Sequence, residues 1–215
     1  MLFWLICLRG FRRSSPKLSA LALTFHKSGS PDDIQKAEGW LELCEKLFGV
    51  RNAFFTGDAI VALADLYRRA GRYAEAEDLL KRALPMREKL FGKDEYRVGD
   101  CLNYLATVYH AQGKEAEAEP LYQRSLAIYE KALGSNHSYT ATALYCLAEL
   151  YSHQKRYAEA EPFYKRAITS MEQSNHPDLP EALGNYAALL KETGKTSEAF
   201  SLELKAKEIR SKRED

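Results

Sequence analysis

Four of the five histidines in this 215-residue chain are the residues whose type and placement could support metal binding. His110 and His153 lie on two neighbouring predicted helices and could approach each other. Two imidazoles without a third ligand make a poor zinc site, because structural zinc takes four ligands and catalytic zinc takes three. His137 and His176 occupy equivalent loop positions, where capping of the loop explains them better than coordination. We therefore predict no metal site and no cofactor.

Paired glutamates are the second set of residues that could do chemistry, as a general acid and base. The pairs Glu75/Glu77 and Glu117/Glu119 recur in the same local sequence. Recurrence indicates charged helix starts, where acids favour the N-terminal dipole, whereas catalysis needs one unique site. The sequence contains no GxSxG, Walker-type or GxGxxG motif. It also offers no set of titratable groups that would converge in a pocket. We predict that the protein is not an enzyme.

Bulk composition limits the class of protein further. Hydrophobic residues make up 46% of the chain and charged residues 28%, which is typical of a soluble protein with a core. The 31 basic and 30 acidic residues nearly balance, so no basic field supports nucleic-acid binding. The four cysteines stand far apart without a CxxC pair, which indicates reduced residues of a cytoplasmic protein. They are Cys7, Cys44, Cys101 and Cys146.

The elements that carry these residues belong to a repeated phrase. It reads GRYAEAEDLLKRAL from Gly71, GKEAEAEPLYQRSL from Gly113 and KRYAEAEPFYKRAI from Lys155. A fixed period of this size, with small and aromatic residues in register, indicates a solenoid. The central alanines of the three copies, 42 residues apart, are Ala76, Ala118 and Ala160.

A helix with the pattern Leu-Ala-x-x-Tyr precedes each copy of the phrase, as in Leu63, Ala64 and Tyr67. These positions share one face of a helix. A short turn follows, in which Gly71 and Gly113 supply a helix C-cap. The sequence therefore predicts an all-α fold of antiparallel helix pairs.

The repeats define the predicted domain organisation. Residues 18–29 align with residues 60–71, and the motif EKLFG recurs, so residues 18–55 are interpreted as a degenerate first repeat. The last helix ends KAKEIRSKRED, a charged sequence suited to a solvated cap. Residues 56–215 are predicted to hold four full repeats, at about 56–97, 98–139, 140–178 and 179–210.

Residues 1–17 form a separate apolar and basic segment. Its charges Arg9, Arg12 and Arg13 follow the apolar run, unlike those of a secretory signal. As a helix the apolar run spans only about 10 Å, against roughly 30 Å of bilayer core, so it cannot cross a membrane. We interpret the segment as a helix that packs over the end of the array, or as part of a longer protein. The alternative is a weak membrane-surface anchor or partner-docking segment formed by residues 1–13.

Together these residues resemble the tetratricopeptide repeat family over roughly residues 18–210. The period of 42, with EAEPLYQRSLAIYEKALGSNH, resembles the kinesin-light-chain type of repeat, in which a long second helix precedes a Leu-Gly-x-x-His-Pro loop. Here that loop reads LGSNH from Leu133 and NHP from Asn175. The long heptad region by which kinesin light chains join their motor is absent.

The resemblance implies a right-handed α-α superhelix whose first helices line a concave peptide-binding groove. The two-carboxylate clamp of some family members needs Lys and Asn where this chain has Val61 and Asp65, so that mode is not expected. Asn103 falls where kinesin-light-chain repeats often carry Asn, and its amide could hold an extended backbone. The implied groove positions are Asp65, Arg68, Arg69, Asn103, Thr107, His110, Tyr145, Glu149, His153, Asn185 and Lys191.

We therefore predict a cytoplasmic adaptor or scaffold that binds a peptide segment of a partner protein in this groove. One alternative is a membrane-peripheral assembly factor anchored by residues 1–13. Another is a structural module in which the apolar N-terminal edge pairs two chains.

Overall fold

The structure is a computed structural model that describes residues 30–48 and 55–214. Every regular element within these ranges is a helix, which confirms the predicted all-α fold class. The segment 1–17 and the first helix expected in the degenerate repeat lie outside the described residues. The helices are α2 (Pro31–Phe48), α3 (Phe55–Arg69), α4 (Tyr73–Phe91), α5 (Tyr96–Ala111), α6 (Glu115–Leu133), α7 (Ser138–His153), α8 (Tyr157–Gln173), α9 (Leu179–Glu192) and α10 (Thr196–Glu214).

The chain divides into two compact units, one ending at Leu90 and the other beginning at Phe91. The first unit contains α2, α3 and nearly all of α4. α2 contacts α3, and the Tyr67 hydroxyl of α3 donates a hydrogen bond to Glu38 of α2 at 2.6 Å. The buried Arg87 of α4 donates to Asp58 of α3 at 2.5 Å, so a polar contact also joins α3 to α4.

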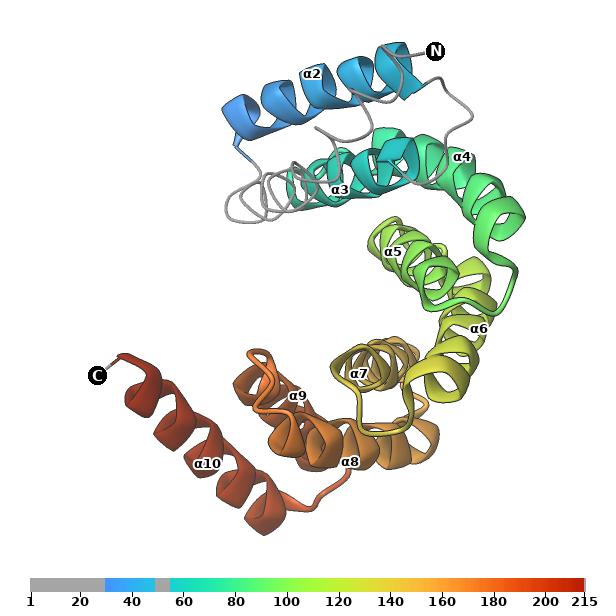
Figure 1. The fold of residues 1–215 in the computed structure, drawn as a ribbon. Coiled ribbons are helices and arrows are strands. Elements are labelled where there is room, and N and C mark those ends of the chain that lie inside the picture. The colour runs from blue at the N-terminus through green and yellow to red at the C-terminus, as the bar shows by residue number, and fades with distance from the viewer. Residues whose placement is uncertain (1–29, 49–54, 215) are drawn as a thin grey trace. The chain divides into compact units, whose positions relative to one another are not determined.

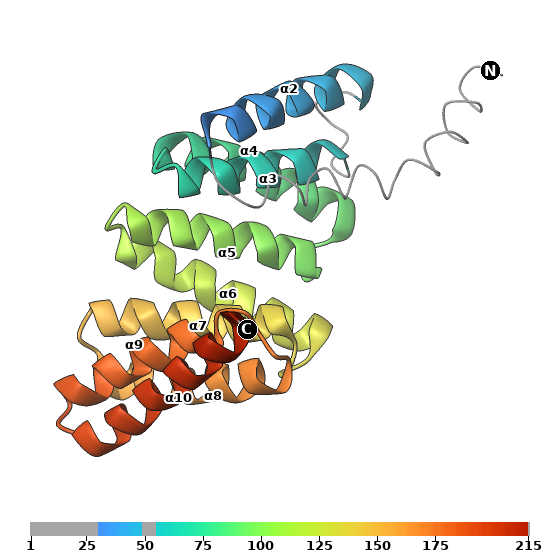
Figure 2. The ribbon, with the colours of Figure 1, turned by 90° about the vertical axis from the view of Figure 1, so that its left-hand side faces the viewer.

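The second unit contains α5 to α10 as three helix pairs, α5/α6, α7/α8 and α9/α10. The first helices form one layer, in which α7 contacts both α5 and α9, and the second helices α6, α8 and α10 form the other layer (Figure 1). Figure 2 shows the same pairs following one another in chain order. Each copy of the repeated phrase lies at the turn and start of a second helix, as its apolar spacing predicts.

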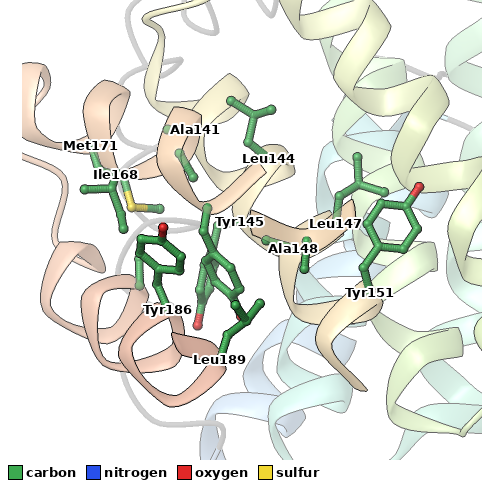
Figure 3. Packing of buried hydrophobic residues seen from close by; sticks show 14 of the residues in the cluster. Ala141, Leu144, Tyr145, Leu147, Ala148, Tyr151, Ile168, Met171, Tyr186 and Leu189 are labelled. Atoms are coloured by element: carbon green, nitrogen blue, oxygen red, sulfur yellow. The ribbon is translucent and has the colours of Figure 1, made fainter. Parts of the chain in front are cut away.

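Small residues let the helices of a pair approach closely. Ala106, Ala118, Ala148 and Ala160 are all fully buried. A Cβ at Gly99 of α5 would lie only 2.9 Å from the Tyr129 ring of α6, so this crossing requires glycine. Larger side chains fill the space between the layers, where residues of α7, α8 and α9 form one apolar cluster (Figure 3). Burial of these side chains provides the main driving force for folding.

The turns within the helix pairs share one backbone conformation. Gly71 and Gly113 both have φ of +75°, which confirms the predicted glycine C-caps. The N–H groups of Arg72, Lys114 and Arg156 each donate to the carbonyl of the repeat tyrosine five residues earlier, at 2.8 Å. This bond closes the last helical turn in the manner of a Schellman motif. Lys155 adopts the same left-handed conformation with φ of +59°, although it carries a side chain.

The last helix departs from the predicted polar cap. α10 is rich in charge, but Phe200 is 67% exposed and Leu204 is 51% exposed. Phe200 corresponds to Glu161 and Leu204 to Lys165 in the preceding repeat. Glu161 and Lys165 both interact with Tyr186 of the next helix pair, and Glu161 also binds Lys195. α10 is the last helix that the structure describes. Because charged residues dominate the sequence of α10, Phe200 and Leu204 were not identified from the sequence as exposed apolar side chains one turn apart.

Two further features bear on the class of protein. Among the helices of the described ranges, none combines the length and apolar character that a membrane crossing requires. Cys44 and Cys101 are buried, Cys146 is half-buried, and none of these three thiols forms a disulfide. Burial raises the pKa of Cys44 to about 11, and the Glu45 carboxylate adds to the rise. This thiol is therefore protonated at neutral pH and is a poor nucleophile.

Candidate functional site

The predicted groove residues of the first unit all lie on α3, where they form ion pairs with one another. Asp65 is only 2% exposed. The Arg68 Nη2 lies 2.7 Å from its Oδ1, and the Arg69 Nε lies 2.9 Å from its Oδ2. One carboxylate thus holds two arginines that lie one turn further along α3. The structure brings these three residues together as an intrahelical ion-pair cluster.

A second cluster joins α7 to α9 in the second unit. The Tyr145 hydroxyl donates to the Glu149 Oε1 at 2.8 Å. The Asn185 Nδ2 lies 2.7 Å from the same carboxylate oxygen and 2.8 Å from the Tyr145 hydroxyl. Three residues that the sequence assigned to the groove therefore meet at one point. Their hydrogen bonds cross between two repeats.

The electrostatic environment of Glu149 is unfavourable to its charge. Burial raises the pKa of the Glu149 carboxyl, and the hydrogen bond from Tyr145 opposes the rise. The nearby Glu181 carboxylate raises the pKa further, whereas His153 and Asn185 lower it. Burial also raises the pKa of the Tyr145 hydroxyl, which stays protonated and can only donate to Glu149. A perturbed pKa of this kind is a feature of functional sites.

His110 of α5 and His153 of α7 approach each other as predicted. Their ring centroids are 4.8 Å apart, with an edge-on angle of 63° between the planes. Burial lowers the pKa of His110, and the neighbouring His153 lowers it further. No group of three possible metal ligands occurs in the described part of the chain. The pair can offer ring nitrogens to a ligand but does not by itself form a metal centre.

Asn103 and Thr107 lie one turn apart on α5. The Asn103 side-chain oxygen is buried and has no hydrogen-bond partner among the described residues. The Thr107 hydroxyl donates to the Asn103 backbone carbonyl at 2.9 Å and accepts from the Tyr122 hydroxyl at 3.0 Å. Lys191, the last predicted groove residue, pairs with Glu203 of α10 at 2.5 Å. Asn103 therefore holds an unused acceptor, whereas Thr107 and Lys191 have partners within the chain.

The two loop histidines accept backbone hydrogen bonds in their loops, as their sequence positions predicted, and His137 is also the N-cap of α7. The His137 Nδ1 accepts from the Tyr139 N–H at 3.2 Å, and the His176 Nδ1 accepts from the Asp178 N–H at 3.2 Å. Burial lowers the pKa of His176, which favours the neutral form that can accept this bond.

The recurring acids connect one helix pair to the next, which the sequence pattern alone did not reveal. The Glu119 carboxylate accepts from the Tyr151 hydroxyl at 3.0 Å and from Arg156 at 2.8 Å. Glu161 binds Lys165 and Lys195, and these hydrogen bonds lower its pKa to about 2. The signal was available, because the second glutamate of each phrase and the tyrosine of the next first helix share one period. These two acids therefore help to hold successive helix pairs together.

Comparison with known proteins agrees with this architecture. The tetratricopeptide repeat model matches residues 55–131, 100–173 and 139–212. No curated protein matches the sequence.

Solved structures share the fold at low sequence identity. BtubC (BKLC) from P. vanneervenii superposes with a TM-score of 0.72 at 20% identity, covering 94% of this chain and 89% of that one. A putative kinesin light chain from P. anserina superposes with a TM-score of 0.71 at 20% identity, covering 94% of this chain and 98% of that one. Aspartyl phosphate phosphatase F from Bacillus subtilis gives 0.68 at 18% identity, with 84% and 50% coverage. At these identities the likeness concerns the fold alone. The sequence matches and the helix pairs together show that the chain belongs to the tetratricopeptide repeat family.

Proposed function

We propose that the face formed by the first helices α5, α7 and α9 binds a segment of a partner protein. We call it the first-helix face. Tetratricopeptide repeats form non-catalytic scaffolds for protein–protein interaction, which gives the general class. The observation that carries the finer proposal is the cluster of Tyr145, Glu149 and Asn185, in which a half-buried carboxylate accepts hydrogen bonds from two neutral donors.

The chemistry of this face suits an extended or helical peptide. The Asn103 side-chain oxygen can accept a peptide N–H, which would satisfy an acceptor that is otherwise buried without a partner. The Glu149 carboxylate can accept further bonds from backbone or side-chain donors of the peptide. Because the helices hold these groups in place before binding, less conformational entropy is lost on association.

A test begins with selection of peptides from a random displayed library against the whole chain. The affinity of a selected peptide is then measured by calorimetry for wild type, Asn103→Ala and Tyr145→Phe. We expect each change to weaken binding about three- to tenfold, because each removes one or two hydrogen-bonding groups. Tyr145→Phe is preferred to alanine, since the ring is buried and contacts Tyr164.

The matched control is Glu117→Gln on α6, an exposed residue of the second-helix layer. It should leave the affinity unchanged. If the selected peptides bind Asn103→Ala and Tyr145→Phe as tightly as wild type, the first-helix face is not the binding surface.

Self-association is a second candidate, favoured by the exposed Phe200 and Leu204 of α10. These residues occupy positions that contact the next helix pair in earlier repeats, so a second copy could cover them. Sedimentation equilibrium of wild type and of Phe200→Asp/Leu204→Lys provides the test. A dimer that becomes a monomer in the variant supports this candidate, and a monomeric wild type rejects it.

We also propose a cytoplasmic location. Its support is limited to the three described thiols, none of which forms a disulfide. A fluorescent fusion followed by imaging and fractionation tests this location directly.

A further inference from the structure

A recess lies between the α6–α7 loop and helix α8, and none of the predicted groove residues lines it. Its volume is about 330 Å³. One apolar side chain, Leu144 of α7, contributes to its wall. The polar lining residues carry ammonium, guanidinium, hydroxyl or amide groups, and none is a carboxylate. They are Ser135, Asn136, Lys165, Arg166, Thr169 and Ser170.

Ser170 is the residue that distinguishes this recess from a simple packing defect. Its side chain is 3% exposed, and its hydroxyl has no hydrogen-bond partner in the part of the chain that the structure describes. The equivalent positions one and two repeats earlier are Ile128 and Met86. The repeat therefore uses an apolar residue here, and the third copy places a hydroxyl that its own fold leaves unsatisfied. Such a buried group calls for a specific explanation.

The neighbouring groups are mainly donors. The Ser135 hydroxyl donates to the Asn136 Oδ1 at 3.3 Å, which leaves the Asn136 amide NH₂ directed elsewhere. Within the described ranges, Arg166 forms one hydrogen bond, to Glu130, which leaves the other donors of its guanidinium available. Lys165 shares Glu161 with Lys195, so two ammonium groups face one carboxylate there. The loop also precedes the N-terminus of α7, where the helix dipole favours negative charge.

We propose that this recess binds a small phosphate-bearing ligand. The phosphate oxygens would accept from the Ser170 hydroxyl, the Asn136 amide and the Arg166 guanidinium. Arginine is well suited to this role because its planar fork matches phosphate geometry. The recess is larger than an inorganic phosphate ion needs, so a small organic substituent on the phosphate can lie against Leu144.

The first measurement is titration of the full chain with sodium phosphate in a calorimeter, repeated with sodium chloride at equal ionic strength. Wild type should show saturable binding of phosphate and none of chloride. Arg166→Gln should weaken phosphate binding about tenfold, since it removes a charge-assisted contact. Ser170→Ala should weaken it about threefold, and Ser170→Ile, which introduces the residue found at the equivalent position 128, should abolish it by filling the recess.

The matched control is Arg82→Gln. Arg82 occupies the same repeat position in α4 and pairs with Glu45 of α2 at 2.7 Å, as Arg166 pairs with Glu130. This variant should bind phosphate as wild type does. Thermal unfolding of each variant without ligand verifies that the fold is intact, and ligand binding should raise the midpoint only where the recess is preserved.

Two results would overturn the proposal. One is a phosphate response no larger than that to chloride, and the other is equal phosphate affinity in wild type, Arg166→Gln and Ser170→Ala. Titration with O-phosphoserine then distinguishes the source of the phosphate group. Tighter binding than phosphate assigns the recess to a phosphomonoester, and equal binding assigns it to the free ion.

Discussion

Residues 61–71 and 145–155 are two copies of the same stretch of repeat, two 42-residue periods apart, and they satisfy their polar residues in different ways. In the first copy, the Asp65 carboxylate pairs with Arg68 and Arg69 of its own helix. In the second, Glu149 occupies the equivalent position and receives bonds from the neutral groups of Tyr145 and Asn185. Both copies bury the repeat leucine, alanine and tyrosine, which are Leu63, Ala64, Tyr67, Leu147, Ala148 and Tyr151.

The difference shows how one scaffold supports two kinds of surface. The Asp65 carboxylate is neutralised by two cations of its own helix, so its charge is balanced without a ligand. The half-buried Glu149 carboxylate has a raised pKa and neutral donors beside it, so it lowers stability and can still accept hydrogen bonds from a ligand. The identical apolar positions therefore build the fold, and the variable positions between them decide where binding can occur.

The largest expected effect on stability comes from removing the two arginines that neutralise the Asp65 carboxylate in the first copy. Arg68→Met/Arg69→Met leaves Asp65 buried without either cation that now flanks it, at 2% exposure. We expect the free energy of unfolding to fall by about 3 kcal/mol, the low end for a broken buried pair, because the two arginines are themselves partly exposed. Urea denaturation followed by circular dichroism measures it.

Arg82→Met is the control for this double change. Its ion pair with Glu45 is largely exposed, so we expect a loss below about 1 kcal/mol. Equal losses in the two variants would show that burial of Asp65 does not determine the energetics of α3.

The turns of the two copies provide a second comparison, with an intermediate effect. Gly71 has φ of +75°, and Lys155 holds a similar conformation at +59° with a side chain. Lys155→Gly should raise the free energy of unfolding by about 1 kcal/mol, because glycine adopts left-handed φ without steric strain. The same denaturation measurement applies.

Lys205→Gly, in the interior of α10, serves as the opposite case. It should lower the free energy of unfolding by about 1 kcal/mol, since glycine disfavours a helix interior. A loss of stability in Lys155→Gly would contradict the assignment of strain to this turn.

The helices and most of their buried faces could be predicted because the same spacing of apolar and small residues recurs in successive repeats of the chain. The Leu-Ala-x-x-Tyr pattern, the turn glycines and the capping role of His137 depend on residues close in sequence. The meeting of Tyr145 with Asn185 depends on how α7 stacks on α9, 40 residues later, so no local pattern specifies it. Phe200 was missed because its charged neighbours dominated the sequence of α10.

Glu149→Gln tests whether the charge of the Glu149 carboxylate lowers the stability of the second copy. The folded-state pKa of Glu149 is raised above its ordinary value of 4.5, so the native state binds its proton more tightly than the unfolded chain does. Stability should therefore fall as pH rises from 4.5 through the folded-state pKa. The variant removes that decline while its amide oxygen still accepts from Tyr145 and Asn185.

The measurement is the free energy of unfolding of wild type and Glu149→Gln between pH 4 and 8. Their difference should favour the variant increasingly as pH rises. His110 contributes a trend of opposite sign to both proteins, because its lowered pKa makes stability fall as pH drops below 6.5. A difference that does not change with pH would show that burial of Glu149 does not impose the predicted penalty.

His153→Arg should produce the smallest effect and sharpens the comparison most directly. The new guanidinium would stand four residues after Glu149, as Arg69 stands after Asp65, and so recreate the local ion pair of α3. We expect stability at pH 7 to rise by about 0.5 kcal/mol, since pairs at this spacing on a helix contribute a few tenths. The pH-dependent decline due to Glu149 should also diminish. Because the new arginine would neutralise Glu149, the variant should also bind the selected peptides more weakly. A variant with greater stability and unchanged peptide affinity would show that the Glu149 carboxylate does not take part in peptide binding.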